Sequence, residues 1–334
     1  MNTTKILWDA ARVGYKQALP ILSFPATQKL NINVRDMTQN AETQARAMAL
    51  VAKETPTFAA VGLMDLSVEA EAFGANIRFA DNEVPAVTGK LVDGVETAEA
   101  LEVPSLEKGR ALMYVDAVRR AKAYIPDKPL LAGVIGPYSL AGRLMDVTEI
   151  FYACFDEPEM VHKVLSKSTE YIISYCMAFR DAGADGVVMA EPLAGLLNPD
   201  MAEEFSNPYV VKILDAVQSE SFPVVYHNCG GATVQMLPQL FDMKAAAYHF
   251  GNAVDMETVM KGAPADALCM GNIDPAGQFA SGTPESIRAA VFKLMDKCAE
   301  YPNFLISSGC DIPAQASWDN INAFFSAVAE YNAK

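Results

Sequence analysis

In the stretch VVYHNCGG (224–231), a histidine and a cysteine stand two positions apart at the end of an apolar run. Side chains at positions i and i+2 of an extended segment point the same way, so His227 and Cys229 could bind one ion. Gly230 and Gly231 would let the backbone turn sharply around it. A neutral imidazole with thiolates suits Zn²⁺. The alternative is a buried strand that ends in two ordinary core residues, and the pair alone does not decide between them.

A second cysteine strengthens the metal interpretation. Cys310 follows another apolar run, in LISSGCDIPAQ. Together with His227 and Cys229 it would give three protein ligands and leave a fourth position open, as in catalytic zinc sites. A thiol bound at that position would lose its proton and become a thiolate nucleophile at neutral pH.

The elements that must position these residues form a regular series. Apolar, β-rich runs alternate with helical patterns, and strands are predicted at 18–24, 58–64, 130–137, 185–192, 222–228, 245–251, 266–272 and 303–309. Eight strands, each followed by a helix, predict a closed (β/α)8 TIM barrel, an α/β fold. Residues 74–109 break the alternation and predict a β-hairpin insertion after the second strand, covering the barrel mouth. No linker is evident, so residues 1–334 are predicted to form a single domain.

Active sites of such barrels lie at the carboxyl ends of the strands. His227 and Cys229 fall at that end of the fifth predicted strand, and Cys310 follows the eighth. The set can therefore meet across the barrel mouth although the chain between the cysteines is long.

Other polar residues share this position and are further candidates. Asp65 follows the second predicted strand, Glu191 ends the fourth, His249 ends the sixth, and Asp274 and Asp311 follow the last two. Any of these carboxylates could orient a ligand or act as an acid or base. His249 could be a fourth, displaceable zinc ligand, a substrate contact or a structural residue. For Asp274, capping of the next helix is the favoured alternative.

The composition excludes several classes of protein. The chain has 26 Lys and Arg against 41 Asp and Glu, a net charge of −15, and such a surface repels nucleic acid and anionic lipid. No run approaches the ~20 apolar residues that span a bilayer. The first residues do not resemble a signal peptide, so we expect a cytoplasmic protein whose six cysteines are reduced. The cysteines outside the proposed site are predicted core residues: Cys154, Cys176, Cys269 and Cys298.

Three stretches, HNCGG, GNIDP and SSGCDIP, on eight predicted βα units with the insertion, resemble the uroporphyrinogen decarboxylase superfamily. Within it they are similar to the cobamide-dependent methyltransferases, and the resemblance covers nearly the whole chain. It implies Zn²⁺ on His227, Cys229 and Cys310. It further implies methyl transfer from methylcobalamin, or a methylated corrinoid on a separate corrinoid protein, to a small thiol such as coenzyme M.

The resemblance leaves two other functions open. Asp65 matches the essential aspartate of the decarboxylases, but the RQAGR-like stretch that holds the carboxylates of their substrate is absent from SFPATQKLNINVRD. A third possibility is a non-catalytic, zinc-containing partner of a corrinoid protein. The sequence does not identify the acceptor thiol. The sulfonate of coenzyme M would need a cationic or amide-rich pocket, for which Gln28, Lys29 and Arg143 are the nearest candidates.

Overall fold

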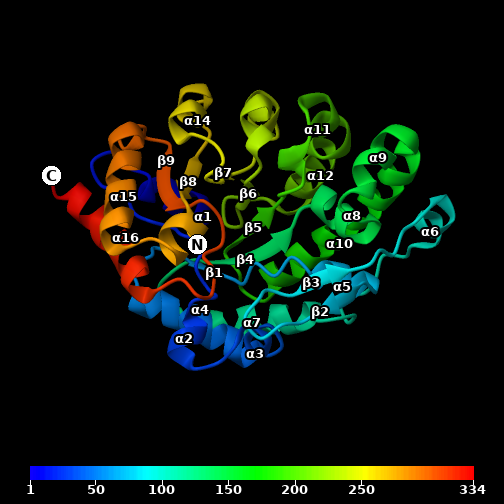
Figure 1. Cartoon of the computed structure of the whole chain (residues 1–334), viewed down its shortest axis with the longest axis horizontal. Coiled ribbons are helices and arrows are strands. Elements are labelled where there is room, and N and C mark those ends of the chain that lie inside the picture. Colours follow the sequence, from blue (N-terminus) through cyan, green and yellow to red (C-terminus); the bar gives the residue numbers. More distant parts are fainter.

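The computed structural model describes residues 1–334 throughout. Its centre is a curled sheet of seven parallel strands in the order β1-β4-β5-β6-β7-β8-β9, with helices on its outer side (Figure 1). Each strand lies beside the next strand of the series, which is the arrangement of a TIM-barrel-like α/β fold. The strands are β1 (Ala60–Val61), β4 (Leu130–Ile135), β5 (Gly186–Ala190), β6 (Val224–Asn228), β7 (Ala247–Phe250), β8 (Cys269–Ile273) and β9 (Phe304–Ser308).

Helices connect the strands, and their starts carry the expected capping residues. The Asn40 side chain accepts a hydrogen bond from the Thr43 N–H at the start of α4, and Thr283 and Ser286 form a capping box at the start of α15. The helices are α1 (Thr3–Ala10), α2 (Ala26–Leu30), α3 (Val34–Thr38), α4 (Ala41–Glu54), α5 (Val68–Phe73), α6 (Val95–Ala100), α7 (Ala111–Tyr124), α8 (Pro137–Met145), α9 (Glu149–Asp156), α10 (Pro158–Asp181), η1 (Ala194–Leu196), α11 (Pro199–Phe205), α12 (Asn207–Val217), η2 (Gly231–Met236), α13 (Leu237–Asp242), α14 (Met256–Gly262), η3 (Pro275–Ala280), α15 (Pro284–Cys298) and α16 (Trp318–Asn332).

The first predicted strand, residues 18–24, is not a regular strand, so the prediction of eight paired strands is wrong at this position. The segment touches β9 through a single parallel bridge, and the Leu19 N–H donates to the Ile306 carbonyl at 3.1 Å. Pro20 has no N–H to donate, which interrupts the ladder. A side chain makes the next contact instead, because the Ser307 hydroxyl donates to the Leu19 carbonyl at 2.6 Å. The segment therefore occupies the place beside β9 without adding a strand to the sheet.

Residues 74–109 hold a small antiparallel ribbon. β2 (Asn76–Arg78) pairs with β3 (Ala86–Thr88), and α5 separates the ribbon from β1. A cavity of about 480 Å³ is lined both by Asn82, in the turn of the ribbon, and by Ala314, in the loop that follows β9. The ribbon thus approaches the loop at the carboxyl end of the last strand.

The buried apolar side chains form two groups. A group of 93 residues lies between the sheet and the outer helices. A second group of 16 residues includes positions from α1 and from every strand of the sheet, such as Val225 of β6 and Leu305 of β9, and fills the inside of the curl. Because strand side chains alternate, His227 lies on the same inner side as Val225. The fold therefore turns His227 toward the interior.

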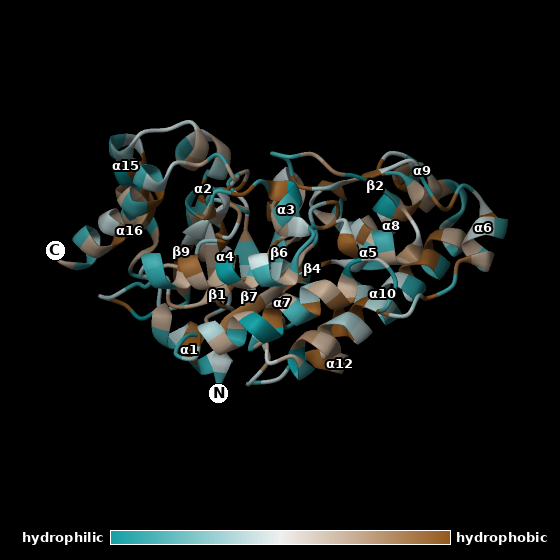
Figure 2. Cartoon of the chain, turned by 90° about the horizontal axis from the view of Figure 1, so that it is seen from below, coloured by the Kyte–Doolittle hydropathy of each residue, from teal (hydrophilic) through white to brown (hydrophobic).

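The outer helices are amphipathic. Figure 2 shows hydrophilic and hydrophobic residues alternating along helices such as α7 and α10, as expected when one face packs on a core and the other meets solvent. None of the helices combines the length and the apolar character that a bilayer-spanning segment needs.

Candidate metal centre

Three ligand-type side chains come together at the carboxyl ends of β6 and β9. One ligand atom each from His227, Cys229 and Cys310 lies within 4.8 Å of those of the other two. The Nε2 of His227 is 3.5 Å from the Sγ of Cys310, although 83 positions separate them. His227 is buried and both cysteines are half-buried. The inward direction of His227 on β6 and the turn after Asn228 therefore bring the His227 and Cys229 side chains close to Cys310, which follows β9.

The distance between His227 and Cys310 fits one edge of a tetrahedral zinc site. With Zn–S bonds of about 2.3 Å and Zn–N bonds of about 2.0–2.1 Å, two ligand atoms of one tetrahedron are roughly 3.6–3.8 Å apart. The distance of 3.5 Å between His227 Nε2 and Cys310 Sγ is close to that edge. Two sulfurs and one imidazole nitrogen are also donors that zinc accepts, and they leave a fourth position for another ligand. His227, Cys229 and Cys310 are thus the residues that could hold the metal.

Without metal, the two thiols share one proton. A hydrogen bond from Cys310 lowers the pKa of Cys229 to about 7, against the opposing effect of burial. The same hydrogen bond, with burial, raises the pKa of Cys310 to about 12. Above pH 7 Cys229 is therefore mainly the thiolate of the pair and Cys310 the thiol, and a cation would take the place of the shared proton.

The loop after β6 holds Cys229 in position. The Asn228 side-chain oxygen accepts hydrogen bonds from the Gly230 N–H at 3.1 Å and from the Thr233 hydroxyl at 2.7 Å, which fixes the turn. Gly251, at the end of β7, lies so close that a Cβ atom there would be 2.5 Å from the Cβ of Cys229. Cys229 therefore owes its place to a rigid polar turn and to the missing side chain at 251.

A small, mostly apolar cavity of about 80 Å³ opens onto the three ligands. Asp311 also lines it, and one oxygen of its carboxyl group is buried without a hydrogen-bond partner. No arginine or lysine lines this cavity. Its remaining walls are Ile21, Met64, Leu66, Ala190 and Pro192.

His249 lies behind His227 rather than in front of it. The two histidines are neighbours in register on β7 and β6, and their Nδ1 atoms are 2.8 Å apart. The other ring nitrogen of His249, Nε2, is 2.7 Å from the Ser307 hydroxyl. Both ring nitrogens are thus occupied inside the protein, so the geometry does not place His249 as the fourth ligand that the sequence had suggested.

Asp65 lies outside the cavity. Its carboxylate is fully buried and accepts hydrogen bonds from Arg110 and from the Tyr114 hydroxyl, both at 2.6 Å, as well as from the Ser67 hydroxyl. Met64 and Leu66 on either side face the cavity instead. Asp65 therefore joins the end of β1 to the start of α7, which gives it a structural partner rather than contact with the ligands.

Glu191 also has a structural partner. Its buried carboxylate accepts hydrogen bonds from the backbone N–H groups of Tyr138 and Ser139 at the start of α8. Burial raises the pKa of Glu191 to about 7, although these hydrogen bonds act in the opposite direction. Glu191 thus orients the amino end of α8, and it is not one of the residues lining the cavity.

Gln28, Lys29 and Arg143, the candidates for binding an anionic acceptor, differ in the hydrogen-bond and ion-pair partners of their side chains. The Gln28 side chain donates to the carbonyls of the loop after β9, including that of Ala316. Lys29 forms an ion pair with Glu54 at 3.0 Å. Arg143, on α8, has a buried Nε without a hydrogen-bond partner. Of the three side chains, Arg143 is the one with a buried donor that has no partner.

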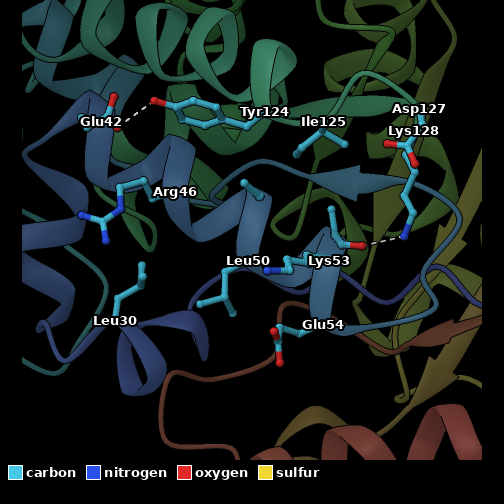
Figure 3. Close-up of a pocket in the computed structure, with 12 residues that line it drawn as sticks. Leu30, Glu42, Arg46, Leu50, Lys53, Glu54, Tyr124, Ile125, Asp127 and Lys128 are labelled. Carbon is cyan, nitrogen blue, oxygen red and sulfur yellow. Dashed lines mark hydrogen bonds between the residues drawn. The ribbon is translucent and has the colours of Figure 1, made fainter.

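A larger cavity, of about 660 Å³, lies away from this centre, between α2, α4 and the residues after α7 (Figure 3). The Tyr124 hydroxyl donates to Glu42 at 2.9 Å, and the Lys128 ammonium donates to the Ala52 carbonyl at 2.6 Å. Acidic and basic side chains alternate around it, and no histidine or cysteine lines it. This groove between outer helices therefore lacks the groups that define the metal centre.

Two residues that contact candidate side chains were not predicted from the sequence: Ser307, beside His249, and Arg110, beside Asp65. Ser307 gave a signal, since it is a polar residue on the inner face of the apolar run FLISS, two positions after Leu305. Arg110 gave none, because only the folded chain brings it to Asp65. The remaining cysteines are all buried, which confirms their prediction as core residues: Cys154, Cys176, Cys269 and Cys298.

A curled parallel sheet with ligand groups at its carboxyl edge defines a TIM-barrel-like α/β protein. The chain belongs to the uroporphyrinogen decarboxylase (URO-D) family, whose family model matches residues 13–331.

Individual relatives fall into two kinds of enzyme. The chain is 28% identical to the methylcobamide:CoM methyltransferase MtbA of Methanosarcina acetivorans, over 87% of the chain and 86% of the relative. It is 25% identical to a uroporphyrinogen decarboxylase of Hydrogenovibrio crunogenus, over 93% and 89%. A solved methyltransferase from Methanosarcina mazei has the same fold, with a TM-score of 0.87 at 22% identity over 98% of both chains.

Proposed function

We propose that this protein transfers a methyl group from a methylated corrinoid to a small thiol, with zinc held by His227, Cys229 and Cys310. The observation that carries the proposal is the convergence of three zinc-type ligand atoms within 4.8 Å at the strand ends. The similarity to a methylcobamide:CoM methyltransferase supports both the donor and the type of acceptor.

The proposed ligands suit this chemistry by their charge. Zinc bound there would hold the acceptor thiol as a thiolate at neutral pH. Cys229 and Cys310 would bring two negative charges to the site and His227 none. The acceptor sulfur would thus retain more electron density than in a site built from histidines alone.

The reaction balances without another reactant. A lone pair of the acceptor sulfur forms the new bond to the methyl carbon, while the cobalt–carbon bond breaks and leaves both electrons on cobalt, which passes from +3 to +1. The thiol proton leaves to solvent or buffer. No oxidant or reductant is consumed, so the chain needs only to hold the thiol and to admit the methyl group.

The small cavity supports a donor that remains outside it. Its volume of about 80 Å³ is below the roughly 300–1,000 Å³ of pockets that enclose a whole ligand. It can take the reacting end of a thiol and a methyl group, whereas a tetrapyrrole macrocycle must stay at the mouth. Apolar walls such as Met64 and Ala190 would keep water away from the sulfur. The ribbon formed by β2 and β3 would then belong to the surface that meets the corrinoid protein.

Decarboxylation of uroporphyrinogen is the second candidate, favoured by the decarboxylase relatives. Two features of the chain oppose it. Asp65 is buried and bound to Arg110. The cavity also has no cationic side chain to hold the carboxylates of such a substrate. Incubation with uroporphyrinogen and analysis for coproporphyrinogen separates the two activities directly.

Metal content is the first test. Purified protein should contain about one zinc per chain, and Cys229→Ala or Cys310→Ala should lose it. Cys269→Ala is the matched control, since this cysteine is buried in β8 away from the centre, and it should keep the metal. Folded wild-type protein that takes up no zinc from a zinc-containing buffer would contradict the proposal.

Turnover is the second test. Methylcobalamin and a panel of thiols, coenzyme M and homocysteine among them, are mixed with the protein, and loss of the cobalt–carbon absorbance is followed. The wild type should demethylate the corrinoid with at least one thiol, and Cys310→Ala should not. Binding of methylcobalamin without turnover, for every thiol, would instead favour a non-catalytic partner of a corrinoid protein.

A further inference from the structure

A line of buried hydrogen bonds runs from the candidate metal centre to the first segment of the chain. His227 Nδ1 lies 2.8 Å from His249 Nδ1, and His249 Nε2 lies 2.7 Å from the Ser307 hydroxyl. The hydroxyl lies 2.6 Å from the Leu19 carbonyl. All four residues are at most 3% exposed, so each polar group must find its partner within the protein.

The last group of this line determines the direction of every bond in it. The Leu19 carbonyl can only accept, so the Ser307 hydroxyl must donate its single proton to it. Ser307 can then only accept from His249, which places the proton of that neutral ring on Nε2. His249 Nδ1 is left as an acceptor, so the proton between the two rings belongs to His227 Nδ1. In the neutral His227 ring, Nε2 therefore carries the lone pair.

A second carbonyl requires the same direction independently. The backbone oxygen of His249 lies 3.3 Å from His227 Nδ1 and can only accept a hydrogen bond. Both neighbours of this nitrogen thus call for a proton on it. The opposite nitrogen of His227, Nε2, lies 3.5 Å from Cys310 Sγ. Nε2 is thus the atom of His227 that faces the other two ligands.

We propose that His249 and Ser307 are positioning residues that hold His227 in the Nδ1–H tautomer before any metal is bound. The Leu19 carbonyl sets this tautomer from outside the centre, and the lone pair of Nε2 is aimed at the two cysteines in advance. The metal's identity as zinc rests on the proposed function, whereas the tautomer does not. Groups that orient a ligating histidine in this way typically contribute 10–100-fold to metal affinity.

The tautomers can be read directly, because the chain has only three histidines. In metal-free protein labelled with ¹⁵N in the imidazole rings, two-bond ¹H–¹⁵N correlations distinguish the Nδ1–H form from the Nε2–H form. We expect His227 in the Nδ1–H form and His249 in the Nε2–H form. His162 serves as an internal control of folding, because its Nδ1 is bound to the Tyr209 hydroxyl on the outer helices. A wild-type spectrum with His227 in the Nε2–H form overturns the proposal.

Variants of Ser307 test whether the two rings are linked. In Ser307→Ala the His249 Nε2–H loses its acceptor, so the proton can move to Nδ1 and reverse the bond to His227. We therefore expect a second form in which both rings change tautomer together, and a zinc dissociation constant about tenfold higher. Ser307→Thr keeps the hydroxyl and should show the wild-type tautomers and the wild-type zinc dissociation constant. Unchanged tautomers and unchanged zinc affinity in Ser307→Ala, with the His162 signals intact, would also overturn the proposal.

Two amide variants of His249 separate its two bonds. In His249→Asn, an oxygen can replace Nδ1 as the acceptor for His227, whereas His249→Gln can replace only the Nε2 donor toward Ser307. Zinc affinity measured by chelator competition should fall 10–100-fold in His249→Gln and clearly less in His249→Asn. Equal affinities in the two variants would show that the acceptor at Nδ1 has no role. If the wild type shows the expected tautomers and yet binds no zinc, the proposed function fails while the assigned tautomers stand.

Discussion

Replacing the shared thiol proton by a metal ion should release a number of protons that depends little on pH. With pKa values of about 7 for Cys229 and about 12 for Cys310, the metal-free pair carries about 1.2 protons at pH 7.5 and about 1.0 at pH 9. Two independent thiols with the ordinary pKa near 8.5 would carry about 1.8 protons at pH 7.5 and only about 0.5 at pH 9. The sign follows from competition, since each displaced proton weakens metal binding as the pH falls.

The proton count is measured by titration calorimetry of metal-free protein with zinc, in pairs of buffers that have the same pH but different heats of ionisation. The released count should stay near one between pH 8 and pH 9.5, and the apparent affinity should rise about tenfold per pH unit. Cys269→Ala should behave like the wild type. A count that declines toward about 0.5 at pH 9 would refute the reasoning, because it would mean that the two sulfurs do not share a proton before the metal binds.

Three further perturbations test other parts of the centre. Arg110→Met leaves the buried Asp65 carboxylate without its ion partner, so the free energy of unfolding in urea should fall by about 3–5 kcal/mol, and an unchanged midpoint would contradict the importance of this pair. Ala190→Leu fills the cavity beside the ligands, so methyl transfer should slow roughly 100-fold with zinc content unchanged; a normal rate would mean that the thiol binds elsewhere. If Arg143 binds the anionic group of the acceptor, Arg143→Ala should raise KM for an anionic thiol about 10–100-fold and leave a neutral thiol unaffected, and equal effects on both thiols would exclude that role.

The alternation of strands and helices along the chain could be predicted from the sequence. Seven of the eight apolar runs are strands, and the placement of Cys229 and Cys310 after two of them correctly anticipates that they converge. The failure at 18–24 also has a local cause, since Pro20 lies within the apolar run and breaks its ladder with β9. The proline is itself evidence against a regular strand at residues 18–24.

The partners of the side chains could not be predicted, because they depend on contacts between distant elements. His249 and His227 both end apolar strands, and only the register of β6 on β7 decides that one ring lies behind the other. Asp65 likewise has the position of a reactive carboxylate at a strand end, yet it forms an ion pair with Arg110, 45 positions later. Residue type and spacing thus indicate which groups are available, whereas the packing decides which of them remain free.

The contact between residues 18–24 and β9 also bears on the order of folding. Leu19 and Ser307 are 288 positions apart, so their hydrogen bond closes one of the longest loops available to this chain. Contacts of such sequence separation carry a large entropic cost and form late, after the local βα units. The line of hydrogen bonds that aims His227 needs this contact, and the ligand set needs β9 as well. Metal should therefore bind after the sheet and the segment beside β9 have formed, and metal uptake during refolding should follow, rather than guide, the formation of the sheet.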